Sequence, residues 1–134
     1  MLIRLTFVAL LLGGCGSSSA PPPECNGTSC QCPAGESCDI GDSACSGASC
    51  SLACSDHNVC TGTCGASCSV TCDGMSTCRV TVGASGSVSC DTGTTCRVTC
   101  TGSCSVSCAT GSICELECPA DTAPHSVPGG GTCS

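Results

Sequence analysis

The feature that most constrains this chain is a five-residue pattern in which two cysteines and a central apolar residue alternate with small polar residues. The pattern recurs eight times between Cys50 and Cys118 and reads C-x-V-x-C or a close variant. Its units begin at positions 50, 60, 68, 78, 86, 96, 104 and 114, so their starts advance alternately by 10 and 8 residues. Two units therefore make a repeat of 18 residues.

Each unit has the period of a β-strand. The cysteines and the central valine occupy positions i, i+2 and i+4, which places them on one face of an extended chain. In the unit CSVTC, we expect Cys68, Val70 and Cys72 to face inward and Ser69 and Thr71 to face solvent. The linkers between units are rich in Gly, Ser, Thr and Asp, the composition of turns.

Two all-β folds place two short strands in each 18-residue repeat. In a β-solenoid, alternate units stack into one parallel sheet and the remaining units into a facing sheet. In an antiparallel meander, successive units pair as hairpins. We favour the solenoid because residues 18 positions apart then stack on like residues, and because a lone meander sheet leaves its cysteine and valine face uncovered. The sequence thus predicts a small, disulfide-rich β-solenoid.

Composition explains why such a fold needs cross-links. Cysteine accounts for 21 of 134 residues, Trp and Tyr are absent, and the one aromatic residue is Phe7. Each buried aliphatic side chain contributes roughly 1.5–3 kcal/mol, whereas ordering about a hundred residues costs on the order of 100–200 kcal/mol. A covalent scaffold is expected when so little core is available. The expected architecture is similar to the disulfide-laddered solenoids of some insect antifreeze proteins, although their coil is shorter and differently spaced.

The repeat also indicates which cysteines pair. Val82 and Gly86 stand at two positions where the pattern has cysteine, and they flank one three-residue turn. The two cysteines of a bonded pair are expected to be lost together, because losing one of them leaves the other as a free thiol. By analogy, cysteines on either side of each turn should bond, whereas pairing Cys68 with position 82 would orphan Cys68 and Cys100. The predicted bonds are Cys64–Cys68, Cys100–Cys104, Cys54–Cys60, Cys72–Cys78, Cys90–Cys96 and Cys108–Cys114, with Cys25–Cys30, Cys32–Cys38, Cys45–Cys50 and Cys118–Cys133 for the remainder.

The segments flanking the repeat, which spans residues 50–118, are less regular. Residues 25–49 are expected to form an irregular cysteine-rich cap, with GDSA at 41–44 as an insertion, since terminal repeats of stacked arrays are commonly atypical. The Pro- and Gly-rich tail, residues 119–134, is expected to be a loop stapled by Cys133.

The N-terminal residues have the features of an export signal. Arg4 precedes an apolar run at 5–12 that is too short to span a bilayer as a helix. The segment LGGC at 12–15 resembles a bacterial lipobox. That resemblance implies that residues 1–14 are a lipoprotein signal peptide and that Cys15 carries the lipid, with palmitate among its acyl chains. An ordinary secretory leader, with Cys15 as one more disulfide partner, is the alternative.

Several features agree with a lipid anchor at Cys15. Without it, 20 cysteines remain, an even number that can pair completely. Residues 15–24 then read as a lipidated Ser/Pro tether. Gly16 replaces the Asp that favours inner-membrane retention in enterobacterial sorting, so the resemblance implies the outer membrane. The chain resembles uncharacterised Cys-rich lipoproteins of Gram-negative bacteria, which implies a cell-envelope location facing the periplasm or the surface.

The charge balance limits the partners. Loss of Arg4 with the leader changes the formal net charge from −7 to −8 and leaves Arg79 and Arg97 as the cations. This acidity argues against nucleic acid, whose affinity depends on neutralising phosphates, and against polybasic attachment to anionic lipid. We expect Arg79 and Arg97 to lie side by side, one coil apart, with Glu115 next in line. The partners that remain compatible with this charge are a membrane, contacted through the lipid, and a surface glycan or protein.

The residues give no expectation of catalysis, of a cofactor or of a metal site. The two histidines, His57 and His125, lie in a turn and in the tail, and neither has a nucleophile arranged beside it. We therefore expect a structural or interaction role. Two alternatives stay open. Ser51, Ser69, Ser87 and Ser105 would form a flat hydroxyl face for ice or glycan, and the cysteines would bind metal as thiolates, although only Cys30 and Cys32 have C-x-C spacing.

Overall fold

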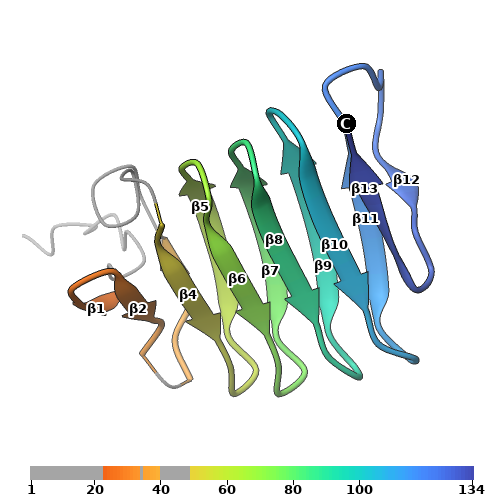
Figure 1. Ribbon diagram of the computed structural model, residues 1–134. Coiled ribbons are helices and arrows are strands. Elements are labelled where there is room, and N and C mark those ends of the chain that lie inside the picture. The colour runs from red at the N-terminus through yellow and green to blue at the C-terminus, as the bar shows by residue number, and fades with distance from the viewer. Residues whose placement is uncertain (1–22, 34, 40–48) are drawn as a thin grey trace, which may run out of the picture.

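The computed structural model describes residues 23–33, 35–39 and 49–134. Over these residues the chain winds through two facing β-sheets and contains no helix (Figure 1). Several sequence predictions concern residues outside the described ones. These are the signal peptide at 1–14, the lipid site Cys15, tether residues 16–22, the insertion at 41–44 and Cys45.

Each sheet is built from alternate strands of the chain. Sheet A has seven strands, in the spatial order β1 (Glu24–Asn26), β2 (Ser29–Gln31), β4 (Ser51–Cys54), β6 (Ser69–Cys72), β8 (Gly86–Cys90), β10 (Cys104–Cys108) and β13 (Gly130–Cys133). Sheet B has six, in the order β12 (His125–Ser126), β11 (Ile113–Glu117), β9 (Thr95–Cys100), β7 (Thr77–Val82), β5 (Val59–Cys64) and β3 (Cys38–Asp39).

The register confirms the 18-residue coil. In sheet A, Ser69 pairs in parallel with Ser51 and with Ser87. In sheet B, Cys78 pairs in parallel with Cys60 and with Cys96. Strands β4 to β11 therefore form a β-solenoid with two strands in each coil, as Figure 1 shows. The antiparallel meander is wrong for the repeat, because consecutive strands from β4 to β11 lie in different sheets.

The first coil joins this array with a longer offset. Ser29 pairs with Ser51, and Cys38 pairs with Cys60, so both sheets are offset by 22 residues here instead of 18. The four additional residues fall between β3 and β4, where the sequence places the GDSA insertion. The segment predicted to be an irregular cap therefore contributes strands to both sheets.

Antiparallel strands end sheet A at both edges and sheet B at its C-terminal edge. At the N-terminal end, β1 and β2 form a hairpin. At the C-terminal end, β12 pairs with β11 and β13 pairs with β10. Such strands pair the backbone groups that a parallel stack leaves open at its edge. The prediction that 119–134 is a loop is therefore wrong, and Glu24, assigned to the tether, lies in β1.

Gly130 explains why the tail resembles a loop in sequence although it contains a strand. Its φ is 111°, which favours glycine, and a Cβ there would overlap the carbonyl oxygen of Val106. A glycine that reads as a turn signal in sequence is thus required by the close approach of β13 to β10. Only the tertiary contact distinguishes these two uses of glycine.

The core lies between the two sheets. Of the 26 buried apolar residues described, 17 are cysteines. The rest are Leu52, Val70, Val80, Val82, Val88, Val98, Val106, Leu116 and Val127. Sulfur thus occupies most of the interior that larger side chains fill in other small domains. Within the residues described, no helix has the length and apolarity needed to cross a membrane.

The two kinds of turn follow from their sequences. In the short GAS turns, Ser67 and Ser85 have φ of 57° and 62°, and Ser67 N–H donates to the Ala84 carbonyl of the next coil. Gly83 packs on Gly65, since a Cβ at Gly83 would lie 2.7 Å from the Gly65 carbonyl carbon. In the long turns, the residue before the strand donates its N–H back three positions, as from Ser76 to Asp73.

Candidate functional site

The disulfides are the chemical feature that the fold organises. Nine link described cysteines, and each joins two cysteines that the sequence analysis paired. They are Cys25–Cys30, Cys32–Cys38, Cys54–Cys60, Cys64–Cys68, Cys72–Cys78, Cys90–Cys96, Cys100–Cys104, Cys108–Cys114 and Cys118–Cys133. Cys50 is also disulfide-bonded, and its predicted partner, Cys45, lies outside the described residues. In the repeat, each bond crosses one turn and so ties sheet A to sheet B.

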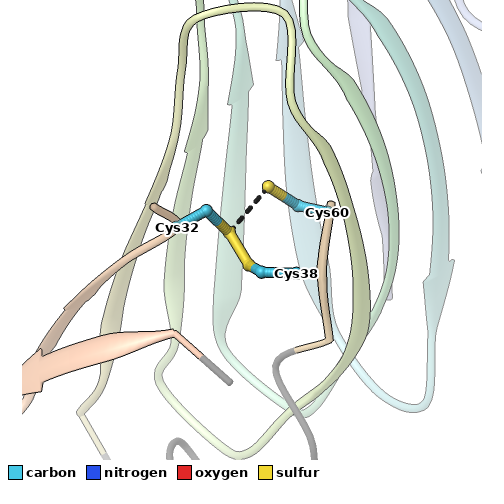
Figure 2. Close-up of side chains that lie close together, drawn as sticks. All are labelled: Cys32, Cys38 and Cys60. Carbon is cyan, nitrogen blue, oxygen red and sulfur yellow. Dashed lines mark hydrogen bonds between the residues drawn. A yellow bond between two sulfur atoms is a disulfide. The ribbon is translucent and has the colours of Figure 1, made fainter. Parts of the chain in front are cut away.

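Sulfurs of neighbouring coils also come close to one another. Figure 2 shows the Cys32–Cys38 bond beside Cys60, with 2.9 Å between the Sγ atoms of Cys32 and Cys60. These two cysteines are 28 residues apart in the sequence. Four groups of three cysteines have all three Sγ atoms within 4.8 Å of one another: Cys32/Cys38/Cys60, Cys72/Cys78/Cys96, Cys90/Cys96/Cys114 and Cys100/Cys104/Cys133.

Each of these sulfur groups has the same composition, namely one complete disulfide and one sulfur of a neighbouring disulfide. Soft metals bind the thiolate form of cysteine. Because every described cysteine is disulfide-bonded, the groups present no thiolate in this oxidised state. Their geometry instead places sulfur next to a disulfide in a neighbouring part of the fold.

Among the described residues, the short turn at 83–85 has no disulfide and is filled differently. Val82 pairs with Cys64 on one side and Cys100 on the other, and Gly86 pairs with Cys104. Val82 is fully buried, and a Cβ on Gly86 would overlap its Cγ1 atom. The valine side chain therefore occupies the space of the absent bond, and its partner position has no side chain for that reason.

The outer face of sheet A carries a row of hydroxyls that is longer than the sequence predicted. Ser51, Ser69, Ser87 and Ser105 align across four parallel strands. Ser29 extends the row onto β2, and Thr132 extends it onto β13. All six side chains are exposed, and each lies on a different strand of sheet A, from β2 across to β13. Strands lie about 4.8 Å apart, so the hydroxyls recur at about that interval.

Sheet B has a different outer face. Arg79 and Arg97 pair directly, and Glu115 follows Arg97 in the same row, as the repeat predicts. The Arg97 Nε lies 3.7 Å from the Glu115 Oε2, and both side chains are about half exposed, at 53% and 47%. An exposed pair of this kind contributes on the order of 0–1 kcal/mol. This face therefore contributes little electrostatic stability.

The two histidines lie in different parts of the fold, a long turn and strand β12. His57 is exposed in a long turn with φ of 64°. His125 is exposed in β12, and its Nδ1 lies 3.3 Å from the Asp121 Oδ2. The same Asp121 oxygen accepts the backbone N–H of Cys118 at 2.8 Å. Asp121 and His125 thus brace the loop that follows Cys118.

Sequence reasoning missed a buried polar stack beside the long turns. Asn58, Ser76 and Thr94 recur every 18 residues, and each is 1% exposed. The Asn58 Nδ2 donates to the Pro33 carbonyl at 3.0 Å, and the Ser76 Oγ donates to the Cys54 carbonyl at 3.1 Å. These bonds satisfy backbone groups of the turns. The signal was present as a polar residue two positions before each of Cys60, Cys78 and Cys96.

Comparison with known proteins gives no relative from which a function can be transferred. No family model, no curated protein and no solved structure matches this chain.

Proposed function

We propose that this protein is a lipid-anchored component of a bacterial cell envelope, with a structural or interaction role and no catalytic activity. The proposed anchor is a lipidated Cys15, by resemblance of residues 12–15 to a lipobox. The proposed location is the outer membrane, because Gly16 stands in place of the Asp that favours inner-membrane retention. The tether then carries the solenoid away from the membrane surface.

The observation that best supports this proposal is the oxidised core. All 19 described cysteines are disulfide-bonded, and cysteines supply most of the buried apolar residues. Disulfides persist in oxidising compartments such as the periplasm and the cell surface, and they are rare in the cytosol. A protein with this core therefore requires export, which is the role assigned to residues 1–14.

The lipid anchor is tested with Cys15→Ser, expressed with its own leader in a Gram-negative host. Wild-type protein should partition into detergent, and its intact mass should equal the chain from residue 15 plus the acyl chains. The variant should lose the acyl mass and the membrane fraction, because serine offers no sulfur for the lipid. Ser18→Ala, in the same segment, is the matched control and should remain anchored.

The outcome that refutes the anchor is a wild-type mature chain with an unmodified residue 15 in the aqueous fraction. Alkylation of the same samples, without reduction, adds a second measurement. It should add no mass, since the predicted pairing leaves no free thiol.

A second candidate function is recognition of a periodic hydroxylated surface, such as a polysaccharide or ice, by sheet A. The observation that favours it is the six-hydroxyl row defined by Ser29, Ser51, Ser69, Ser87, Ser105 and Thr132. A rigid solenoid presents such a row at a fixed interval, so binding would require little ordering of the protein.

Two substitutions in the centre of the row test this candidate. Ser69→Val with Ser87→Val keeps strand propensity but removes two adjacent hydroxyls. We expect retention on a polysaccharide array, or thermal hysteresis, to fall at least tenfold. Thr81→Val with Thr99→Val on sheet B is the matched control and should retain wild-type binding. Wild-type protein without retention on any glycan and without thermal hysteresis would exclude the candidate.

A further inference from the structure

One disulfide of the solenoid links the surface to the interior. Cys118 is partly exposed, while its partner Cys133 is 5% exposed. The loop after Cys118 is held by the contact of Asp121 with the Cys118 N–H and with His125. The more exposed cysteine of this bond therefore lies at the start of a braced segment.

The buried end of this bond lies close to a second disulfide. The Sγ atoms of Cys100, Cys104 and Cys133 all lie within 4.8 Å of one another. Cys133 on β13 stands directly opposite Cys104 on β10 in the antiparallel register. Two cysteines that face each other across antiparallel strands can form a disulfide in this protein. Cys25 and Cys30 do so, with Cα atoms 4.1 Å apart. A Cys104–Cys133 bond is therefore compatible with the same type of strand pairing.

From this arrangement we propose that the C-terminal end of the solenoid is a thiol–disulfide exchange site. Its substrate class is an external thiol or dithiol, either a small molecule or a protein. Exchange passes from Cys118 through Cys133 to the buried Cys100–Cys104 bond. This inference does not depend on the lipid anchor or on the hydroxyl row.

The exchange consists of two displacements. An external thiolate attacks the Cys118 Sγ, so a mixed disulfide forms at Cys118, the Cys118–Cys133 bond breaks, and its electron pair leaves on Cys133. The Cys133 thiolate then attacks the Cys104 Sγ. The Cys104–Cys133 bond forms, the Cys100–Cys104 bond breaks, and Cys100 leaves as a thiolate that takes a proton from water. The sulfur of the external thiol is oxidised, the sulfur of Cys100 is reduced, and the number of disulfide bonds stays constant.

The other sulfur groups lack an entry point for an external thiol. Cys90, Cys96 and Cys114 are each at most 3% exposed, and the bonding partner of Cys114, Cys108, is 8% exposed. Exchange depends on access to the attacked sulfur. The Cys90–Cys96 bond therefore serves as an internal reference within the same molecule.

The proposal is tested on the oxidised full chain with limited dithiothreitol, followed by acid quench, alkylation and peptide mapping. Cys100 should be alkylated at least tenfold faster than Cys90, together with appearance of a Cys104–Cys133 link. The double variant Cys118→Ser, Cys133→Ser should slow Cys100 labelling to the Cys90 rate. The matched control Cys25→Ser, Cys30→Ser, which removes the staple at the other end, should leave Cys100 labelling unchanged.

A single variant tests the second displacement without any reductant. Cys118→Ala leaves Cys133 as a thiol beside Cys100–Cys104, so the purified protein should contain a Cys104–Cys133 link with Cys100 alkylated. If Cys133 is the one thiol labelled in this variant, or if Cys100 in the double variant is labelled as fast as in the wild type, the exchange path is wrong.

Discussion

Full reduction of the disulfides is expected to unfold this protein completely. Each bond across a turn closes a loop with a sequence separation of 4 or 6 residues. In the chain-entropy model, one such bond stabilises the fold by roughly 2–3 kcal/mol. The free energy of unfolding of a small domain is only about 5–15 kcal/mol. Loss of the six such bonds described in the repeat would remove roughly 12–18 kcal/mol, which is comparable to this whole free energy or larger.

The remaining interactions cannot replace the lost cross-links. The interior described contains nine aliphatic residues and no aromatic one. The exposed Arg97–Glu115 pair adds on the order of 0–1 kcal/mol. Reduction would also convert the 19 described cysteines into thiols in place of a packed sulfur core.

Circular dichroism and hydrogen exchange on the mature chain measure this effect. The oxidised protein should show β-sheet and protected amides, and the reduced, alkylated protein should show neither. Oxidised protein carried through the same alkylation is the control. A reduced chain that kept its β-sheet spectrum would contradict the claim that disulfides replace the apolar core.

The second large effect is expected at the turn without a disulfide. Gly86→Ala adds a Cβ that overlaps Val82, and overpacking of this kind typically costs 1–3 kcal/mol. The double variant Val82→Cys, Gly86→Cys should restore a bond equivalent to Cys64–Cys68 and Cys100–Cys104. A loop of this length is worth about 2 kcal/mol in the chain-entropy model. The two changes therefore act in opposite directions on the free energy of unfolding.

Thermal unfolding of oxidised samples compares the variants. Gly86→Ala should lower the Tm, and the double cysteine variant should raise it, with a new link between positions 82 and 86 in the peptide map. The control is the double variant Val82→Ala, Gly86→Ala, which loses the valine packing and gains a Cβ without forming a bond. It should be less stable than wild type. A double cysteine variant with free thiols, or with links to other coils, would show that these two positions are not a bonding pair.

The fold and the disulfide pairs are readable from the sequence because both are local. The alternation of Cys68, Val70 and Cys72 with Ser69 and Thr71 assigns the buried face. The joint replacement at 82 and 86 assigns the pairing rule. A fixed repeat of 18 residues then determines which strands stack, since any other offset would break the match of like residues.

Other features required the tertiary structure, because they depend on contacts between distant segments. Ser29 joins the hydroxyl row through a 22-residue offset, and Thr132 joins it through an antiparallel strand. Glycines in the tail read as a loop, but they permit β13 to approach β10.

What the sequence by itself determined was the unit, its period and the bonds across each turn. Only the tertiary structure decided how the array ends and which sulfurs of different coils meet, as Cys32 meets Cys60 and Cys133 meets Cys104. The reason is physical. A bond across a turn is fixed by a few residues of chain, whereas contacts between coils and caps are fixed by the register of whole strands.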